Sequence, residues 1–340
     1  MRILAIETSC DETAIALLEA SGGLTTPNIR VIKNLVSSQV AIHAPFGGVV
    51  PNLAKREHIK NLPVLYEKLA LKAAPDLIAV TVGPGLEPAL WTGIEFAKQI
   101  HRELKDQNSK LKIVGANHLE GHLYSFLLSA NRYQLSVGNP FPAIALIVSG
   151  GHTILMKMDS LTRGTMLGET RDDAVGEAFD KVARILNLSY PGGPEVERLA
   201  AEGNPTAIMF PRPMLHDKNY DFSFSGLKTS VLYYMRDNPK SRVRDVAASF
   251  QAAAIDTLAG KAERAVKAYD ARALFLSGGV AANQALRKRL SVISRKLSVK
   301  FFAPPFKYNT DNAAMIGVAG YVAHLKKKHY PLRANGILSL

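Results

Sequence analysis

The stretch ILAIETSCDETAIALLE, residues 3–19, is the part of the sequence that decides the fold class. Residues 3–8 form an apolar run, residues 9–12 a polar turn, and residues 14–19 a second apolar run, which is the pattern of two strands joined by a turn. A similar pattern returns about 140 residues later in AIALIVSGGHTILMKM, residues 143–158. Two such openings predict two topologically similar lobes.

Helices and strands alternate along the rest of the chain. Apolar spacing and breaker residues predict helices at 51–72, 88–104, 172–187, 194–203, 225–237, 241–270, 281–296 and 311–328, and strands at 76–82, 273–277 and 299–303. This alternation predicts an α/β fold with mixed sheets.

Length and composition describe an ordinary globular protein. The chain has 340 residues, 47% of them hydrophobic and 21% charged, which suggests two domains and excludes a disordered chain. The single cysteine, Cys10, cannot form an internal disulfide, and this favours a reducing compartment. Without an apolar leader or a run of roughly 18 apolar residues, the sequence predicts a cytoplasmic protein that does not span a membrane.

The positive charge is concentrated near the end of the sequence. The net charge is +13, and residues 261–340 contain 15 lysines and arginines against three acidic residues. The basic clusters are 287–289, 295–296 and 326–328. This asymmetry favours a polyanionic partner such as a nucleic acid, and the alternative is a solvated surface that keeps the protein soluble.

The segment NHLEGH, residues 117–122, contains the strongest candidate for a metal site. On a helix, His118 and His122 project from one face one turn apart, as in a metal chelate. The motif superficially resembles that of zinc proteases, but Glu120 lies about 200° around the helix from His118 and cannot act as their base. The alternative is a pair of surface or capping histidines.

The polar segment NTDN, residues 309–312, is the best candidate for a third ligand, and Asp311 is its carboxylate. Two histidines and one carboxylate with open positions suit ferrous iron or zinc. In the alternative, Thr310 or Asp311 only caps the helix that follows.

Three glycine-rich turns, at residues 148–153, 190–194 and 276–283, are candidates for binding phosphate or nucleotide. Taken singly, each is typical of an ordinary turn. Asp180 and Glu197, both on predicted helices, are candidates for ribose contacts, with salt bridges as the alternative.

The acidic turn after the first strand is a further candidate site, because α/β proteins bind ligands at strand ends. Asp11 and Glu12 could orient a substrate amine or act as a base, and the alternative is a solvated turn. No histidine is close to Cys10 in the sequence, so we expect a small buried thiol rather than a nucleophile.

Many motifs stand in one order along the chain: IETSCDET (6–13), GGVVP (47–51), GPGL (83–86), HLEGH (118–122), VSGGHT (148–153), GEAFDK (176–181), PGGP (191–194), FSFSGLK (222–228) and SGGVAAN (277–283). Through this series of motifs the chain resembles the bacterial TsaD family of tRNA-modifying threonylcarbamoyltransferases, which were once described as glycoprotein endopeptidases. The resemblance extends from Arg2 to about His329.

The resemblance implies the two-lobed fold of actin, sugar kinases and heat-shock ATPases, with each lobe a mixed sheet flanked by helices. The lobes would comprise residues 1–116, completed by 311–340, and residues 117–310, with the metal and nucleotide site in the cleft. The implied reaction transfers the threonylcarbamoyl group from threonylcarbamoyl-AMP to N6 of adenosine 37, in tRNAs that read codons beginning with A, and releases AMP.

The resemblance also assigns residues and partners. It implies one Fe²⁺ or Zn²⁺ per subunit on His118, His122 and Asp311, and adenylate contacts from Ile147, Val148, Ser149, Gly150, Gly151, Asp180, Gly193, Glu197 and Asn283. We expect Asp11 or Glu12 to orient or deprotonate the amine. The implied partners are tRNA, a paralogous TsaB-type subunit and a small TsaE-type ATPase, and homodimer formation is left open.

Three features differ from the family pattern: Glu197 stands where some relatives have aspartate, and residues 87–91 and 333–340 are atypical.

A small-molecule kinase or ATPase of the same superfamily is the main alternative function. It would leave His118 and His122 without a role. A metalloprotease and a non-catalytic scaffold are weaker alternatives, since the first lacks its glutamate and the second would be expected to lose the histidines.

Overall fold

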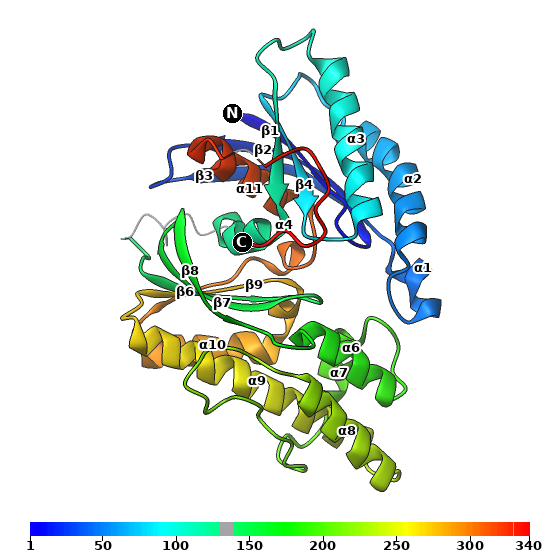
Figure 1. Ribbon diagram of the computed structural model, residues 1–340, viewed down its shortest axis with the longest axis vertical. Coiled ribbons are helices and arrows are strands. Elements are labelled where there is room, and N and C mark those ends of the chain that lie inside the picture. Colours follow the sequence, from blue (N-terminus) through cyan, green and yellow to red (C-terminus); the bar gives the residue numbers. More distant parts are fainter. Residues whose placement is uncertain (130–138, 329) are drawn as a thin grey trace. The chain divides into compact units, whose positions relative to one another are not determined.

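The computed structural model describes residues 1–129, 139–328 and 330–340. It divides into two compact units, one formed by Met1–Gly138 with Pro304–Leu340 and the other by Asn139–Ala303. Figure 1 shows each unit built around its own sheet.

The first unit contains a mixed five-stranded sheet in the order β3-β2-β1-β4-β5. Its strands are β1 (Arg2–Glu7), β2 (Glu12–Ser21), β3 (Asn28–Ser38), β4 (Leu77–Gly83) and β5 (Lys112–Asn117). The predicted hairpin is β1 and β2, which pair antiparallel with Leu4 opposite Leu17. The strands β1, β4 and β5 run parallel.

The helices of this unit are α1 (Val40–His43), α2 (Pro51–Leu69), α3 (Glu87–Leu104), α4 (His118–Tyr124) and α11 (Ala313–Lys326), with 3-10 turns at Ala44–Phe46, Ser125–Leu128 and Phe306–Tyr308. Alternate strand residues such as Leu4 and Ile78 join the core of α2 and α3. α11 also packs on the sheet, where a Cβ at Gly317 would lie 2.3 Å from Leu18. Glycine therefore allows the close approach of α11.

The second unit repeats this topology in the order β10-β9-β6-β7-β8. Its strands are β6 (Ala143–Val148), β7 (Thr153–Ser160), β8 (Arg163–Glu169), β9 (Ala273–Ser277) and β10 (Lys300–Phe302). β6, β7 and β8 are antiparallel, whereas β6, β9 and β10 are parallel, as in the first sheet. The prediction of two topologically similar α/β lobes is confirmed.

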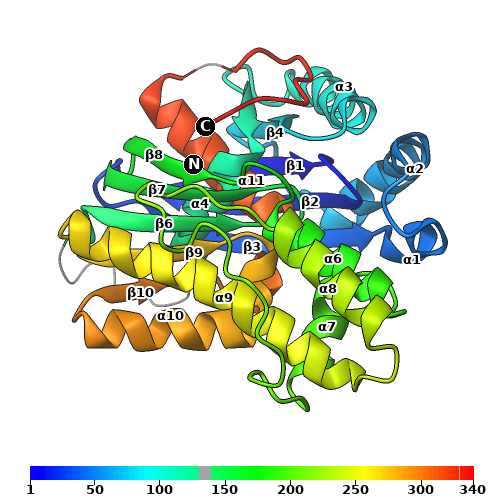
Figure 2. The same ribbon diagram turned by 60° about the horizontal axis from the view of Figure 1, so that its bottom comes forward.

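Helices pack on the second sheet (Figure 2). The apolar side chains of the helices and the sheet form one large core. The helices are α6 (Val175–Ile185), α7 (Gly192–Ala200), α8 (Ser225–Asp237), α9 (Val243–Ala268) and α10 (Gln284–Lys296), the last preceded by a 3-10 turn at Gly279–Ala282. Phe179 of α6 and Phe250 of α9 meet edge to face with ring centroids 4.9 Å apart. Within the part of the chain that the structure describes, no helix has the length and hydropathy to cross a bilayer.

Sequence analysis missed three strands, β3, β5 and β8. All three are outer strands. β3 has no fully buried residue and β8 has one, so neither shows a regular alternation of buried apolar and exposed polar residues. Some predicted helices also extend beyond the observed helices at their ends. α6 begins at Val175 rather than at 172, because the Asp172 carboxylate instead accepts hydrogen bonds from Ser223 Oγ and Phe224 N.

Candidate metal centre

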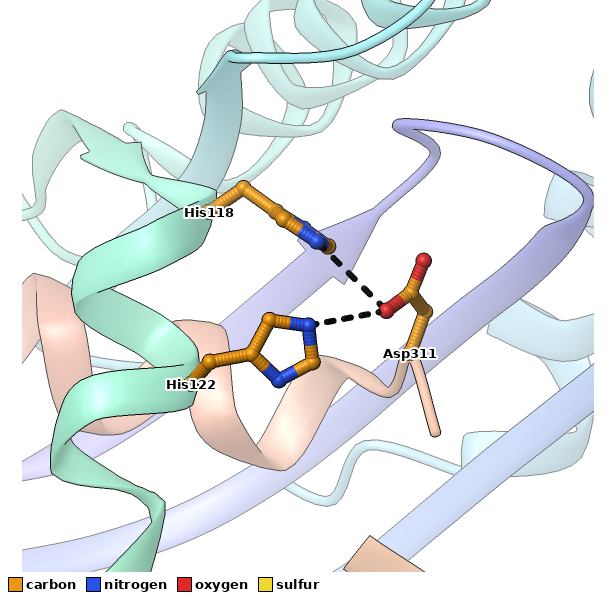
Figure 3. Close-up of side chains that lie close together, drawn as sticks. All are labelled: His118, His122 and Asp311. Carbon is orange, nitrogen blue, oxygen red and sulfur yellow. Dashed lines mark ion pairs between the residues drawn. The ribbon is translucent and has the colours of Figure 1, made fainter. Parts of the chain in front are cut away.

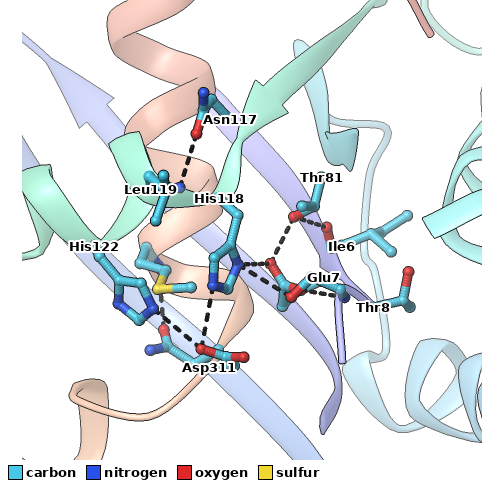
Figure 4. Close-up of polar contacts among 12 residues, drawn as sticks. Ile6, Glu7, Thr8, Thr81, Asn117, His118, Leu119, His122 and Asp311 are labelled. Atoms are coloured by element: carbon cyan, nitrogen blue, oxygen red, sulfur yellow. Dashed lines mark hydrogen bonds and ion pairs between the residues drawn. The ribbon is translucent and has the colours of Figure 1, made fainter. Parts of the chain in front are cut away.

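The chain leaves β5 and enters α4 directly, and this junction places both histidines. Asn117 caps the helix, its side-chain oxygen accepting from Leu119 N at 2.8 Å and Glu120 N at 3.3 Å. All seven residues of α4 are buried. His118 and His122 lie one turn apart with ring centroids 4.7 Å from each other (Figure 4).

Asp311 approaches the histidines from the segment before α11 (Figure 3). Its Oδ1 lies 3.4 Å from His118 Nε2 and 3.1 Å from His122 Nε2. The alternative in which Thr310 or Asp311 caps the helix is wrong, because the cap is Asn312, whose side chain accepts from Met315 N at 3.1 Å. The Asp311 carboxylate faces the two imidazoles instead.

The three side chains fit a metal ion. One ligand atom from each residue lies within 4.8 Å of the others. Both ring nitrogens of His122 are buried and make no hydrogen bond of normal geometry with the described residues. Buried polar atoms are nearly always satisfied, and coordination would satisfy Nε2 here. Two imidazoles and one carboxylate are a donor set for iron or zinc, so the group can hold a metal ion.

Glu7, at the end of β1, contacts the His118 ring nitrogen that faces away from Asp311. Sequence analysis did not select this residue. Its buried carboxylate lies 3.2 Å from His118 Nδ1 and accepts from Thr81 Oγ1 at 2.6 Å and Ser9 N at 2.5 Å. A carboxylate only accepts, so Nδ1 donates to Glu7, and Nε2 is the nitrogen that faces Asp311 and would coordinate a metal after losing its proton. The signal for this role was a charged residue closing an otherwise apolar strand.

Electrostatics make this site attractive to a cation. Burial alone would raise the pKa of Glu7, but the charge of His118 and its hydrogen bond outweigh burial and lower it. Burial works against the charged form of His118, yet Asp311 and Glu7 raise its pKa to about 9. The buried Glu7 and the half-buried Asp311 thus concentrate negative charge around His118.

Glu120 points away from the site, as its position on the helix predicted. Its carboxylate lies 3.2 Å from Lys328 Nζ and 3.9 Å from Lys326 Nζ. The glutamate that a zinc protease would need is therefore committed to the last turn of α11 and the residues after it.

The acidic turn lies beside the histidines through Ser9, whose Oγ is 3.1 Å from His118 Nδ1. Burial, followed by the charges of Asp311 and Asp11, raises the pKa of Glu12 to about 10. Burial raises the pKa of the Cys10 thiol well above its ordinary value. The thiol stays protonated, which agrees with the expectation that Cys10 is not a nucleophile.

The second unit places its candidate residues around two strand ends. Ile147 and Val148 are buried in β6, and Ser149 continues into the turn, where its N donates to His152 O at 2.8 Å. A Cβ on Gly150 or Gly151 would meet nothing within 4 Å. The turn after β9 lies against the end of β6, because a Cβ at Gly278, with φ +92°, would lie 2.2 Å from Val148 O.

Three polar candidates in this unit hold helix ends. Asp180 Oδ1 accepts from Gly192 N at 2.8 Å, and Glu197 Oε1 accepts from Gln284 N at 2.7 Å. Asn283 caps α10 through Leu286 N at 2.9 Å and donates to Gln251 at 2.7 Å. At Gly193, as at the glycines of the first turn, a Cβ would meet nothing within 4 Å.

Two solved structures with similar folds share only 14% sequence identity with the chain. Full-length HypF in a phosphate- and nucleotide-bound form has a TM-score of 0.60 at 14% identity, over 98% of this chain and 47% of that one. The activator of 2-hydroxyisocaproyl-CoA dehydratase from Clostridium difficile, with bound ADPNP, has a TM-score of 0.52 at 14% identity, over 96% of each chain. These likenesses confirm the fold class.

Sequence comparison identifies the family. The family model for TsaD, tRNA N6-adenosine threonylcarbamoyltransferase, matches residues 30–318. The protein of that description from Moorella thermoacetica is 46% identical to this chain, and the match covers 99% of this chain and 96% of the relative. The one from Clostridioides difficile is 44% identical, and the match covers 99% of this chain and 97% of the relative. The chain therefore belongs to the TsaD family, enzymes that transfer a threonylcarbamoyl group to adenosine 37 of tRNA.

Proposed function

We propose that this transferase holds one Fe²⁺ or Zn²⁺ on His118, His122 and Asp311 and takes threonylcarbamoyl-AMP as its donor. The observation that carries the proposal is the convergence of two imidazole nitrogens on one carboxylate oxygen, with Glu7 fixing the His118 ring. A bound divalent ion would supply a Lewis acid to polarise the carbamoyl group. The family assignment favours transfer over the kinase alternative.

The second unit would bind the adenylate part of the donor. The assigned residues are Ile147, Val148, Ser149, Gly150, Gly151, Asp180, Gly193, Glu197 and Asn283. Support comes from Gly150, Gly151 and Gly193, where an added Cβ would meet no neighbouring atom within 4 Å. Neither close packing nor a positive φ requires glycine at these positions, and Gly150 and Gly151 are exposed, as a phosphate-binding turn would need. The similar HypF and activator structures are described with a bound nucleotide.

Asp11 or Glu12 would position the attacking N6 amine, and Asp11 would take its proton, because the raised pKa of Glu12 keeps that carboxyl protonated near neutral pH. Both belong to the turn that contains Ser9, a contact of His118. Adenine N6 is a weak nucleophile, so orientation against an activated carbonyl would contribute much of the rate. As the bond from N6 to the carbamoyl carbon forms, the bond from that carbon to the phosphate oxygen breaks and AMP leaves.

tRNA is the substrate implied by the family. We further propose that the enzyme works in the cytoplasm with a paralogous TsaB-type subunit and a small TsaE-type ATPase.

The variant Gly151→Ala tests the proposed adenylate site. The added methyl meets no protein atom within 4 Å, so we expect an unchanged unfolding midpoint. If the turn holds the phosphate, the methyl occupies ligand space, and the affinity for AMP measured by calorimetry should fall about tenfold or more.

The control is Gly23→Ala, where a Cβ also meets nothing within 4 Å but the turn belongs to the first unit. Its affinity for AMP should match that of the unmodified chain. Unchanged AMP affinity in Gly151→Ala would contradict the assignment of this turn.

A further inference from the structure

Helix α10 presents an unusual charge pattern. Its 13 residues include five basic side chains and no acidic one: Arg287, Lys288, Arg289, Arg295 and Lys296. Leu286, Leu290 and Ile293 form its buried face. Except for the half-buried Arg287, the basic side chains are therefore exposed.

These charges are poorly neutralised. Among the described residues, neither Lys288 nor Arg289 forms an ion pair, and Lys296 lies 3.9 Å from Glu263, which Lys267 already pairs at 2.7 Å. The basic cluster at 326–328 differs, because Lys326 and Lys328 both face Glu120. Of the basic clusters found in the sequence, those of α10 remain the most available to an outside anion.

A groove runs beside this helix within the second unit. The cavity of about 940 Å³ lies between α7, α9 and α10. Ala248, Ala252 and Ile255 of α9 contribute apolar surface, whereas Arg198 of α7 and Lys288 and Arg289 of α10 contribute positive charge. Figure 2 shows α10 alongside α9.

The acidic residues of the groove are already engaged. Asp256 lies 3.0 Å from Arg212, and Glu197, which is also assigned to the adenylate site, accepts from Gln284 N. Arg198 is shared with Glu195 at 3.1 Å, so the excess charge comes from α10.

We propose that the sugar-phosphate backbone of tRNA lies along α10 and the adjoining groove, with Lys288, Arg289 and Arg295 contacting phosphates. This inference rests on the transferase function, which requires a polyanionic RNA substrate to bind. The exposed charges from Lys288 to Lys296 extend along about 12 Å of helix, farther than one mononucleotide phosphate requires. Among the described residues that line the groove, none has an aromatic side chain for base stacking, so the groove would contact the backbone and not read the sequence.

The test compares the full chain with a triple variant, Lys288→Gln, Arg289→Gln and Arg295→Gln. Fluorescence anisotropy with an unmodified tRNA transcript at several salt concentrations gives the affinity and its salt slope. Loss of three phosphate contacts should weaken binding roughly tenfold or more near 0.15 M salt and reduce the slope by about 2 to 3. AMP affinity should remain within twofold.

A matched control replaces basic residues elsewhere on the second unit, Lys218→Gln, Lys240→Gln and Arg163→Gln, which are exposed and remove the same charge. This variant should retain most of the affinity and slope. If it loses as much as the α10 variant, or if the α10 variant binds tRNA normally, the assignment of the surface is wrong. Weakened AMP binding with normal tRNA binding would assign the groove to the nucleotide instead and would also overturn the proposal.

A second measurement needs no substitution. Photocrosslinking of 4-thiouridine-containing tRNA to the unmodified chain should label peptides that cover residues 284–296, and labelling confined to other peptides would contradict the proposal. Failure of the transferase function would appear differently, as tRNA that binds through α10 but yields no modified adenosine.

Discussion

The His122→Ala protein is expected to retain less than a tenth of the normal metal content and to lose threonylcarbamoyl transfer by about a thousandfold or more. In the proposed metal site His122 supplies one of three ligand side chains, and the two remaining ligands would hold a divalent ion weakly. A thousandfold loss corresponds to about 4 kcal/mol of transition-state stabilisation, within the several kcal/mol that a Lewis acid supplies. Metal content is measured by mass spectrometry after dialysis against Fe²⁺ or Zn²⁺.

His101→Ala is the matched control. His101 is a half-buried histidine on α3 whose Nε2 lies 3.2 Å from Leu111 O, outside the metal group. It should keep normal metal content and activity. A His122→Ala protein that binds metal stoichiometrically would show that this group is not the metal site.

Replacing Glu7 by glutamine should lower metal affinity by about 10- to 100-fold, the usual effect of removing the hydrogen-bond partner of a ligand histidine. The change keeps the shape of the side chain but removes the charge that faces His118. Glutamine also has only one oxygen for the three donors from His118, Ser9 and Thr81, so a buried donor loses its partner. We expect an unfolding free energy lower by about 1 to 3 kcal/mol.

A competition titration with a fluorescent chelator measures the metal affinity, and urea unfolding measures the stability. The control Glu19→Gln makes the same change on the neighbouring strand β2, where the carboxylate is exposed and pairs only with Arg30 among the described residues. It should alter neither quantity appreciably. If Glu7→Gln binds metal with unchanged affinity, Glu7 does not orient His118.

Local pattern predicted the two hairpins because each strand is a short apolar run bounded by polar or glycine residues. It failed for β3 and β8, which are edge strands with few buried side chains. The spacing of His118 and His122 was sufficient to place both on one helix face. The position of Asp311 beside both histidines depends on the packing of α11, which brings the residue next to α4 from almost two hundred positions away.

The role of Glu7 could not be predicted from the sequence, because its partner His118 is 111 residues distant. Asp180, Glu197 and Asn283 show a related difficulty. Each bonds a backbone amide at a helix start, so the same side chain holds the fold and is proposed to contact the donor. The sequence also gave no reason to prefer one basic cluster, since only the structure shows that Lys326 and Lys328 face Glu120.

The most direct test of the account is nucleoside mass spectrometry of unmodified tRNA incubated with this chain, the proposed partner subunits and threonylcarbamoyl-AMP. We expect threonylcarbamoyladenosine at position 37 with the metal-loaded chain, and none with the His118→Ala variant. Equal product from His118→Ala and the unmodified chain, or none from a folded, metal-loaded chain with active partners, would contradict it.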